Sequence, residues 1–303
     1  MSWIEQSRLR LDAGELAFVD AGDPEAPPAV LLSGGLTSSY VWRQLIPMLS
    51  PFMRVIAPDL LGSGDSESPE GADLGLRAHA ATVRALLDSL GVERFALAGH
   101  GRGGGVAQLV AVEGGAAALI LIDSVAFDAW PSKTILDMRE RLPDIDDAFV
   151  RSWFETLFER GMRHRERLSA ADLDEFRRPF EGPGGLARFV RVATDLDGEG
   201  LAGIGPQLEA LDIPAFVLWG EDDAFLPAEL AERLGDALPM ASVALLPGCG
   251  HFLLEDAAET VVPLIFQWLR RMYLGVPHGH EEGREVRPVT VQLGRRPPED
   301  DRW

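Results

Sequence analysis

The sequence predicts an α/β fold with a mostly parallel central sheet flanked by helices, on two observations. Short apolar runs alternate along the chain with amphipathic stretches, a pattern typical of strands and helices in alternation. The last six expected strands are apolar throughout apart from Arg54, as strands covered on both faces should be. The expected strands are Arg8–Leu11, Leu16–Asp20, Ala29–Leu32, Arg54–Ala57, Phe95–Ala98, Ala118–Ile122, Phe216–Trp219 and Val243–Leu246. The expected helices are Ser39–Leu49, Leu76–Leu90, Gly104–Val112, Pro227–Ala237 and Ala257–Tyr273.

A helical insertion interrupts this alternation. Between Asp128 and Ile213 the regular pattern stops, over a stretch longer than ordinary connections between elements. Three short helices are expected there, at Phe149–Gly161, Leu168–Phe180 and Gly185–Leu196. The chain is therefore divided into a first core segment at 1–127, a helical cap at 128–213, a second core segment at 214–276 and a mobile, proline-rich tail at 277–303. Within the tail, the run VTVQL is suited to an edge strand.

Composition excludes several classes of protein. The chain has 303 residues, 28 Lys and Arg and 48 Asp and Glu, and a formal net charge of −20. This charge argues against nucleic-acid partners and against binding to an anionic membrane. The single cysteine, Cys249, cannot form an internal disulfide, and neither a secretory signal nor a long apolar run is found. We therefore expect a soluble, cytoplasmic, globular protein; a homodimer stays open.

Three glycine-rich turns follow expected strands. The stretch Leu31–Trp42 (LLSGGLTSSYVW) runs from a strand into a loop of small residues, where backbone N–H groups can approach a ligand and form an oxyanion hole. The stretch Ala57–Ser66 (APDLLGSGDS) is a second such turn. The third, Leu97–Gly105 (LAGHGRGGG), combines strand, sharp turn and helix, as in the strained elbow that lifts a nucleophile above a sheet.

Together these motifs resemble the α/β-hydrolase fold. Within it, the chain is most similar to the haloalkane dehalogenases and epoxide hydrolases, through Thr37–Arg43 and Asp59–Ser66, and Asp123–Pro131 is compatible with this similarity. The resemblance covers about residues 8–275 and implies that the helical insertion is the cap that closes such pockets. It also implies that Trp130, in the segment after the strand Ala118–Ile122, contributes to substrate binding.

The resemblance implies a catalytic histidine and an acid. His251, in the loop GCGHF, matches the histidine position, and Asp223, after the late strand Phe216–Trp219, matches the acid position. Asp123 is a second candidate acid, because some family members use the strand that it ends; Asp223 is preferred. A buried carboxylate fixes the tautomer of an imidazole and raises its basicity, so either pair would form a general base.

The nucleophile is where the sequence departs from the family. The central position of the Gly-x-nucleophile-x-Gly motif is Gly101, which has no side chain and can form no covalent intermediate. The dehalogenase Asn and Trp that grip the halide are replaced by Gly35 and Arg102, and the usual His before the oxyanion loop is Ser33. Dehalogenation by the family mechanism is therefore excluded.

Other side chains were weighed as replacements. Cys249, Ser33 and Ser124 are interpreted as structural rather than nucleophilic, and His100 as a structural histidine beside the elbow. Arg102 remains open: its guanidinium either enters the pocket to bind an anionic group or turns away into a salt bridge. The cap stripe is interpreted mainly as packing; it comprises Phe149, Trp153, Phe154, Leu157 and Phe158.

These features favour a cofactor-independent enzyme without a covalent nucleophile and without a metal. His251 with Asp223 would transfer protons, while N–H groups near Gly35, Leu36 and Arg102 would hold an oxyanion and Gly101 would leave room for substrate or water. Elimination, cyclisation, isomerisation and water addition all fit, on a small molecule with an anionic or carbonyl group. Two alternatives are a non-catalytic binding protein and an ordinary hydrolase in which an Asp or Ser nucleophile has been replaced by an engineered glycine.

Overall fold

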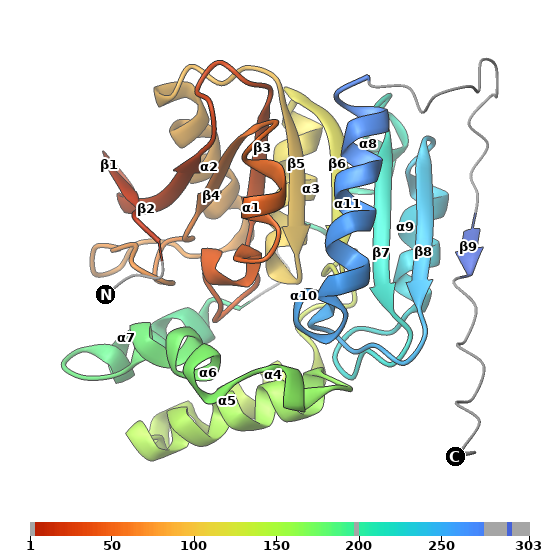
Figure 1. Cartoon of the computed structure of the whole chain (residues 1–303). Coiled ribbons are helices and arrows are strands. Elements are labelled where there is room, and N and C mark those ends of the chain that lie inside the picture. Colours follow the sequence, from red (N-terminus) through yellow and green to blue (C-terminus); the bar gives the residue numbers. More distant parts are fainter. Residues whose placement is uncertain (1–3, 197–199, 276–289, 293–303) are drawn as a thin grey trace, which may run out of the picture.

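A nine-stranded sheet forms the centre of the molecule in this computed structural model, which describes residues 4–196, 200–275 and 290–292. The strand order is β1-β2-β4-β3-β5-β6-β7-β8-β9, antiparallel from β1 to β2 and from β2 to β4 and parallel thereafter (Figure 1). The prediction of a mostly parallel sheet is therefore confirmed. The strands are β1 (Ser7–Leu11), β2 (Gly14–Ala21), β3 (Pro28–Leu32), β4 (Arg54–Pro58), β5 (Phe95–His100), β6 (Ala116–Ile122), β7 (Ala215–Gly220), β8 (Ala241–Leu246) and β9 (Thr290–Gln292).

Helices cover both faces of this sheet. Helices α1 and α11 lie in front of it in Figure 1, whereas α2, α3 and α9 lie behind it. This arrangement buries the apolar strands on both sides and explains why β5 and β7 have no exposed residue. The helices are α1 (Ile46–Leu49), α2 (Leu76–Ser89), α3 (Arg102–Glu113), α4 (Lys133–Arg141), α5 (Asp147–Gly161), α6 (Ala170–Arg177), α7 (Gly185–Thr194), α8 (Gly205–Glu209), α9 (Glu229–Ala237), α10 (Leu253–Asp256) and α11 (Ala258–Met272), with short 3₁₀ turns η1 (Ser39–Trp42), η2 (Leu142–Asp144), η3 (Arg165–Arg167) and η4 (Arg178–Phe180).

Eight strands appear where the sequence predicts them, but some helices differ. The single helix expected at Ser39–Leu49 is wrong: η1 begins after Ser38, whose hydroxyl accepts from the Tyr40 N–H, and α1 begins separately with Pro47 in its first turn. Helices α4, α8 and α10 were not anticipated because they are short or lack a regular apolar stripe. In the expected tail, Thr290–Gln292 pairs in parallel with β8, and the rest lies outside the described residues.

Helix α3 approaches the sheet so closely that only glycine fits at position 103. A Cβ added to Gly103 would overlap the carbonyl oxygens of Leu32 and Ser33 at the end of β3, and one added to Gly99 would overlap the Gly103 carbonyl. Because these neighbours are backbone atoms, they cannot rotate away. The glycines therefore fix how far α3 and the turn before it stand from the sheet.

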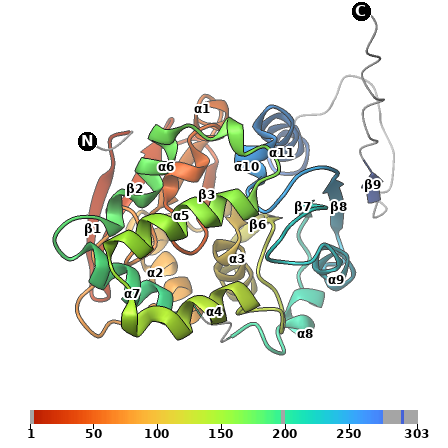
Figure 2. The same ribbon diagram turned by 90° about the horizontal axis from the view of Figure 1, so that it is seen from below.

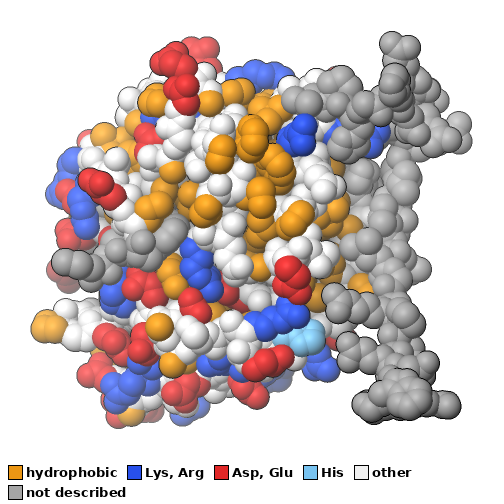
Figure 3. Space-filling model, viewed as in Figure 1, with side chains coloured by type: hydrophobic (Ala, Val, Ile, Leu, Met, Phe, Trp, Pro, Cys, Tyr) orange, Lys and Arg blue, Asp and Glu red, His pale blue; other side chains and the backbone are white. Residues whose placement is uncertain are grey.

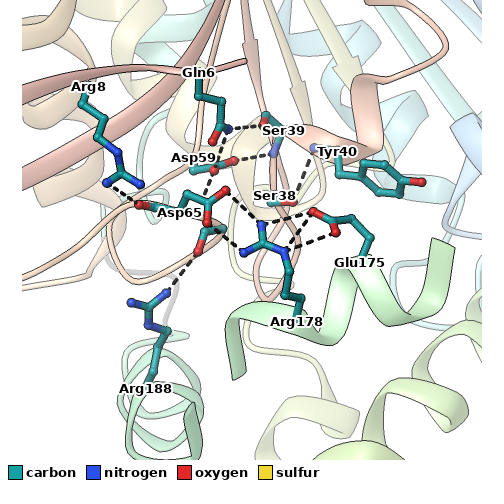
Figure 4. A network of polar contacts seen from close by, with 11 residues as sticks. Gln6, Arg8, Ser38, Ser39, Tyr40, Asp59, Asp65, Glu175, Arg178 and Arg188 are labelled. Carbon is teal, nitrogen blue, oxygen red and sulfur yellow. Dashed lines mark hydrogen bonds and ion pairs between the residues drawn. The ribbon is translucent and has the colours of Figure 1, made fainter. Parts of the chain in front are cut away.

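Helices α4 to α7 form the cap, which lies across the carboxyl ends of the parallel strands (Figures 1 and 2). Polar contacts attach it to the core. Arg178 binds both carboxylate oxygens of Asp65 at 2.8 and 2.9 Å and also contacts Glu175 (Figure 4). Arg188 donates to the Gly64 carbonyl at 3.0 Å. The boundaries 128 and 213 expected for the cap stay a prediction, and α8 within them contacts α3 and α9 of the core.

The surface over α1 and α11 differs from that of the cap. Hydrophobic side chains gather over these two helices, whereas charged side chains dominate the cap below them (Figure 3). Phe52, after α1, is 52% exposed, and its ring lies 5.2 Å from that of Phe266 in α11. None of the helices in the described part of the chain is long and apolar enough to cross a membrane.

The tight approach at Gly103 predicts a large cost for one added methyl group. Gly103→Ala should lower the free energy of unfolding by about 2 kcal/mol or more, because backbone must move to admit the Cβ. Gly205→Ala is the matched control, since a Cβ there meets nothing within 4 Å, and it should change stability by less than about 0.5 kcal/mol. Urea unfolding measures both; equal stability of the two variants would contradict the packing argument.

Candidate active site

The turn between β5 and α3 keeps the geometry of a nucleophile elbow although its central residue is glycine. Gly101 has φ +54° and ψ −121°, a conformation that disfavours other residues. Its N–H donates to the Ile122 carbonyl at 3.0 Å, and its own carbonyl accepts from the Gly104 and Val125 N–H groups. A Cβ at this position would lie 3.3 Å from His251 Nε2. The elbow thus points at the imidazole, with no side chain between them.

His251 and Asp223 are in direct contact. His251 Nδ1 lies 2.8 Å from Asp223 Oδ2, and the Asp223 side chain is fully buried. The other oxygen, Oδ1, accepts from the N–H groups of Phe225 and Leu226 at 2.8 and 3.1 Å. Since Nδ1 donates to the carboxylate, the lone pair of the neutral ring is on Nε2, the atom that faces Gly101. The pair is arranged as a general base.

Asp123, the second candidate acid, has a different partner. It directly follows β6, with φ +43°, and accepts from the Gly220 N–H at 2.8 Å. Burial, followed by the nearby charge of Asp223, raises the pKa of Asp123 well above its ordinary value. The carboxylate that contacts His251 is therefore that of Asp223, and Asp123 instead holds the end of β7.

The expected oxyanion loop is a tight turn at the end of β3. Thr37 donates to the Gly34 carbonyl with both its N–H, at 3.4 Å, and its hydroxyl, at 3.1 Å. Leu36 has φ +61°. A Cβ on Gly35 would lie 2.8 Å from Leu196 and 3.3 Å from the Arg102 Cδ. The loop therefore brings its backbone, rather than a side chain at position 35, to the space above Gly101.

The guanidinium of Arg102, whose direction the sequence leaves open, binds backbone carbonyls of two other segments. Its side chain is buried, and its guanidinium donates to the backbone carbonyl of Leu74 and, at 2.9 Å, to that of Asp195. Burial and then this nearby positive charge hold the pKa of His79 well below its ordinary value. Arg102 lines the pocket, while its charged end ties the loop before α2 to the end of the cap helix α7.

His100 and Cys249 are structural in this arrangement. His100 Nε2 donates to the His251 carbonyl at 3.0 Å, and burial lowers the pKa of His100 to about 3. Burial raises the pKa of the Cys249 thiol to about 11, so it is not a thiolate at neutral pH. The Ser124 hydroxyl donates to the Val125 carbonyl, and Ser33 is fully buried and does not line the pocket.

These residues surround a pocket between cap and core of about 560 Å³, including the open space at its mouth. Of the predicted site residues, Gly35, Leu36, Gly101, Arg102, Trp130 and His251 line it. Sequence reasoning missed several others. The cap stripe supplies two of them, Trp153 and Leu157, while Phe154 and Phe158 of the same helix are buried in packing. The remaining lining residues are Gly34, Thr37, His100, Val125, Ser132, Thr134, Ile135, Leu196, Phe225 and Phe252.

Comparison with known proteins now assigns the fold. The model described as "Alpha/beta hydrolase family" matches residues 29–264, and the chain belongs to this family. Haloalkane dehalogenase 2 of Mycobacterium tuberculosis is 30% identical over 281 residues, 88% of this chain and 93% of that protein. A cis-3-alkyl-4-alkyloxetan-2-one decarboxylase of Xanthomonas campestris is 26% identical over 282 residues, 84% of this chain and 92% of the relative. An α/β hydrolase fold protein from Burkholderia ambifaria has a TM-score of 0.80 at 26% identity, over 86% of this chain and 97% of that one.

The comparisons confirm the resemblance inferred from the motifs and place the chain among enzymes that act on small molecules. Within the described part of the chain, no group of three His, Cys, Asp or Glu side chains could hold a metal ion.

The environment of His100 predicts its titration. The unfolded chain protonates this imidazole near pH 6.5, whereas the folded protein does so only near pH 3. As the pH falls below about 6, protonation of this imidazole in the unfolded chain should therefore lower the free energy of unfolding by about 1.36 kcal/mol per pH unit. His100→Gln should reduce the slope by this amount and leave the contribution of His79, whose pKa burial also lowers, whereas His164→Gln, at a side chain 44% exposed, should leave the slope unchanged. Urea unfolding at pH 6, 5 and 4 checks it, as does NMR of the imidazole; a His100 resonance titrating near pH 6 would contradict the assignment.

Proposed function

We propose that the protein is a cofactor-independent enzyme that uses His251 and Asp223 for general acid–base catalysis without a covalent intermediate. The observation that carries this proposal is the position of His251 Nε2, which faces the Gly101 elbow at the distance where a nucleophile's side chain would begin. A base there faces a position that has no side chain to deprotonate. It acts instead on a substrate C–H or O–H, or on a water molecule, that takes the space above Gly101.

The proton and the charge are both accounted for. His251 Nε2 takes the substrate proton, and the resulting imidazolium is stabilised by Asp223 at 2.8 Å. The N–H groups of Gly35 or Leu36 and of Arg102, which line the same pocket, stabilise the negative charge that forms on a substrate oxygen. His251 then returns the proton to the product. This order of proton transfers can produce elimination, cyclisation, isomerisation or water addition, depending on the atom to which the proton returns.

Relatives support chemistry other than hydrolysis on this scaffold. The Xanthomonas relative is named as a decarboxylase. Its named reaction is therefore not a hydrolysis, although it shares the scaffold. The dehalogenase relative acts on haloalkanes by name, but a covalent route through position 101 is closed to this chain, because Gly101 has no side chain.

Proton transfer can be tested before the substrate is known. The protein is incubated in D₂O with a library of small carbonyl compounds and acids, and deuterium entering carbon positions is detected by mass spectrometry. His251→Ala should abolish incorporation, and Asp223→Asn should reduce its rate by about 100-fold or more because the tautomer is no longer fixed. Asp222→Asn is a matched control, since Asp222 contacts Arg163 rather than His251. Full exchange by His251→Ala would refute the proposal, and ligand binding without exchange would favour a binding protein.

Restoring a nucleophile gives an independent test of the site. Gly101→Ser should place a hydroxyl within reach of His251 Nε2, at a cost of about 1–2 kcal/mol in backbone strain. We expect a slow acyl adduct with p-nitrophenyl acetate, detected by mass spectrometry, which is absent in the double variant Gly101→Ser/His251→Ala. Hydrolysis of esters, epoxides or haloalkanes by Gly101→Ser or Gly101→Asp with kcat/KM above about 10⁴ M⁻¹s⁻¹ would instead show an ordinary hydrolase whose nucleophile was replaced.

A further inference from the structure

Three buried hydrogen-bond donors on the cap side of the pocket have no partner. The indole Nε1 atoms of Trp130 and Trp153 and the hydroxyl of Ser132 all belong to residues that line the pocket, and none of them bonds to any residue in the described part of the chain. A buried donor left unpaired costs about 1–3 kcal/mol. An indole N–H can only donate. The wall that these groups form is therefore complementary to a hydrogen-bond acceptor.

The donors come from two separate elements that converge on the pocket. Trp130 and Ser132 lie in the segment between β6 and α4, and Trp153 lies on α5. Ser132 is the residue before α4, where a serine hydroxyl ordinarily caps the helix, yet its side chain makes no capping bond. Thr134 of the first helical turn also lines the pocket. Ser132 thus lines the pocket with its hydroxyl unpaired although the backbone offers it a local partner.

The electrostatics of this wall favour an acceptor with negative charge. The first turn of α4 contains no acidic residue, so the positive end of the helix dipole is not neutralised there. The guanidinium of Arg102 binds the carbonyls of Leu74 and Asp195, and the wall itself consists of neutral donors. Such a set suits a carboxylate, whose two oxygens can accept from all three donors.

The rest of the pocket defines the other end of the ligand. Gly101, the loop at Gly34–Leu36 and His251 form its core side, and apolar side chains such as Ile135, Leu157 and Phe225 are also part of the lining. A molecule held by one end at the tryptophans has an apolar body and a reacting centre near His251. The net charge of −20 repels such an anion at long range, so binding must come from these short-range donors.

We propose that Trp130, Trp153 and Ser132 bind the carboxylate of the substrate, which is a small, largely apolar carboxylic acid. The statement that this ligand is a substrate rests on the proposed function. Binding of the carboxylate itself does not require His251, so the two can fail separately.

NMR of the indole N–H groups tests the proposal directly. Protein labelled with ¹⁵N is titrated with butanoate and phenylacetate, and with the neutral isosteres butanamide and phenylacetamide. We expect the Nε1–H resonances of Trp130 and Trp153 to move downfield and to saturate with the carboxylates, and the amides to bind at least about tenfold more weakly. The Trp→Phe variants assign these resonances.

Variants separate binding from folding and from catalysis. Trp130→Phe, Trp153→Phe and Ser132→Ala should each weaken butanoate or phenylacetate binding by about tenfold, with thermal unfolding confirming that they fold. Trp268→Phe is the matched control, since Trp268 stacks on Phe216, away from the pocket lining; it should bind as the unaltered protein does. His251→Ala should keep carboxylate binding even if proton transfer is lost.

Two results would overturn the proposal. One is indole resonances that do not respond to the carboxylates, whether or not bromide shifts them. The other is amides that bind as tightly as the carboxylates. If the carboxylates bind as expected but no deuterium exchange is found with any ligand, the carboxylate site stands and the proposed catalysis fails.

Discussion

Buried aspartates that accept backbone N–H groups hold the loops at the carboxyl end of the sheet, and the geometry of the site depends on them. Asp256, fully buried, accepts from the Gly250 N–H at 2.7 Å and from the Arg163 and His164 N–H groups that follow α5. One carboxylate therefore fixes both the loop that carries His251 and the segment where the chain leaves the longest cap helix. Moving the cap at this point disturbs the histidine.

A second carboxylate does the same for the oxyanion loop. Asp59 accepts from the N–H groups of Ser39 and Asp65 at 2.7 and 2.9 Å and from the Gln6 amide at 3.0 Å (Figure 4). Burial raises the pKa of Asp59, and these donors offset part of that cost. Asp65 in turn binds Arg178 of the cap. The segment that follows Gly35 is thus connected to the cap through Asp59 and Asp65.

An ion pair adds a third connection between the same parts. Arg43, just after η1, binds both oxygens of the buried Glu255 at 2.6 and 2.7 Å and contacts Asp172 of α6 at 3.1 Å. Tyr40 donates to Asp172 at 2.7 Å. Removing Arg43 would leave Glu255 buried without its counter-charge, a loss that costs several kcal/mol in comparable sites. These contacts connect the segment after η1, helix α10 and helix α6 of the cap to one another. The elbow is therefore not the only feature that fixes their positions.

The sequence predicts those features that depend on local pattern. The strands, the elbow at Gly101 and the His251–Asp223 pair all follow from short segments with fixed chemistry, and the structure places them accordingly. The direction of Arg102 could not be predicted, because its partners include the backbone carbonyls of Leu74 and Asp195, which leave no signature in the sequence. Trp153 was missed for a related reason, since one apolar helical stripe packs the cap and lines the pocket.

Glycine at the elbow changes the chemistry without relaxing the geometry. A nucleophile at φ +54° carries backbone strain, and a family that must retain the nucleophile must also stabilise that strain. Gly101 removes both the strain and the nucleophile. His251 nevertheless faces the turn, and Asp223 orients His251. A base that is oriented toward a position without a side chain is arranged to act on a bound molecule, which is why we favour proton transfer over a site that only binds.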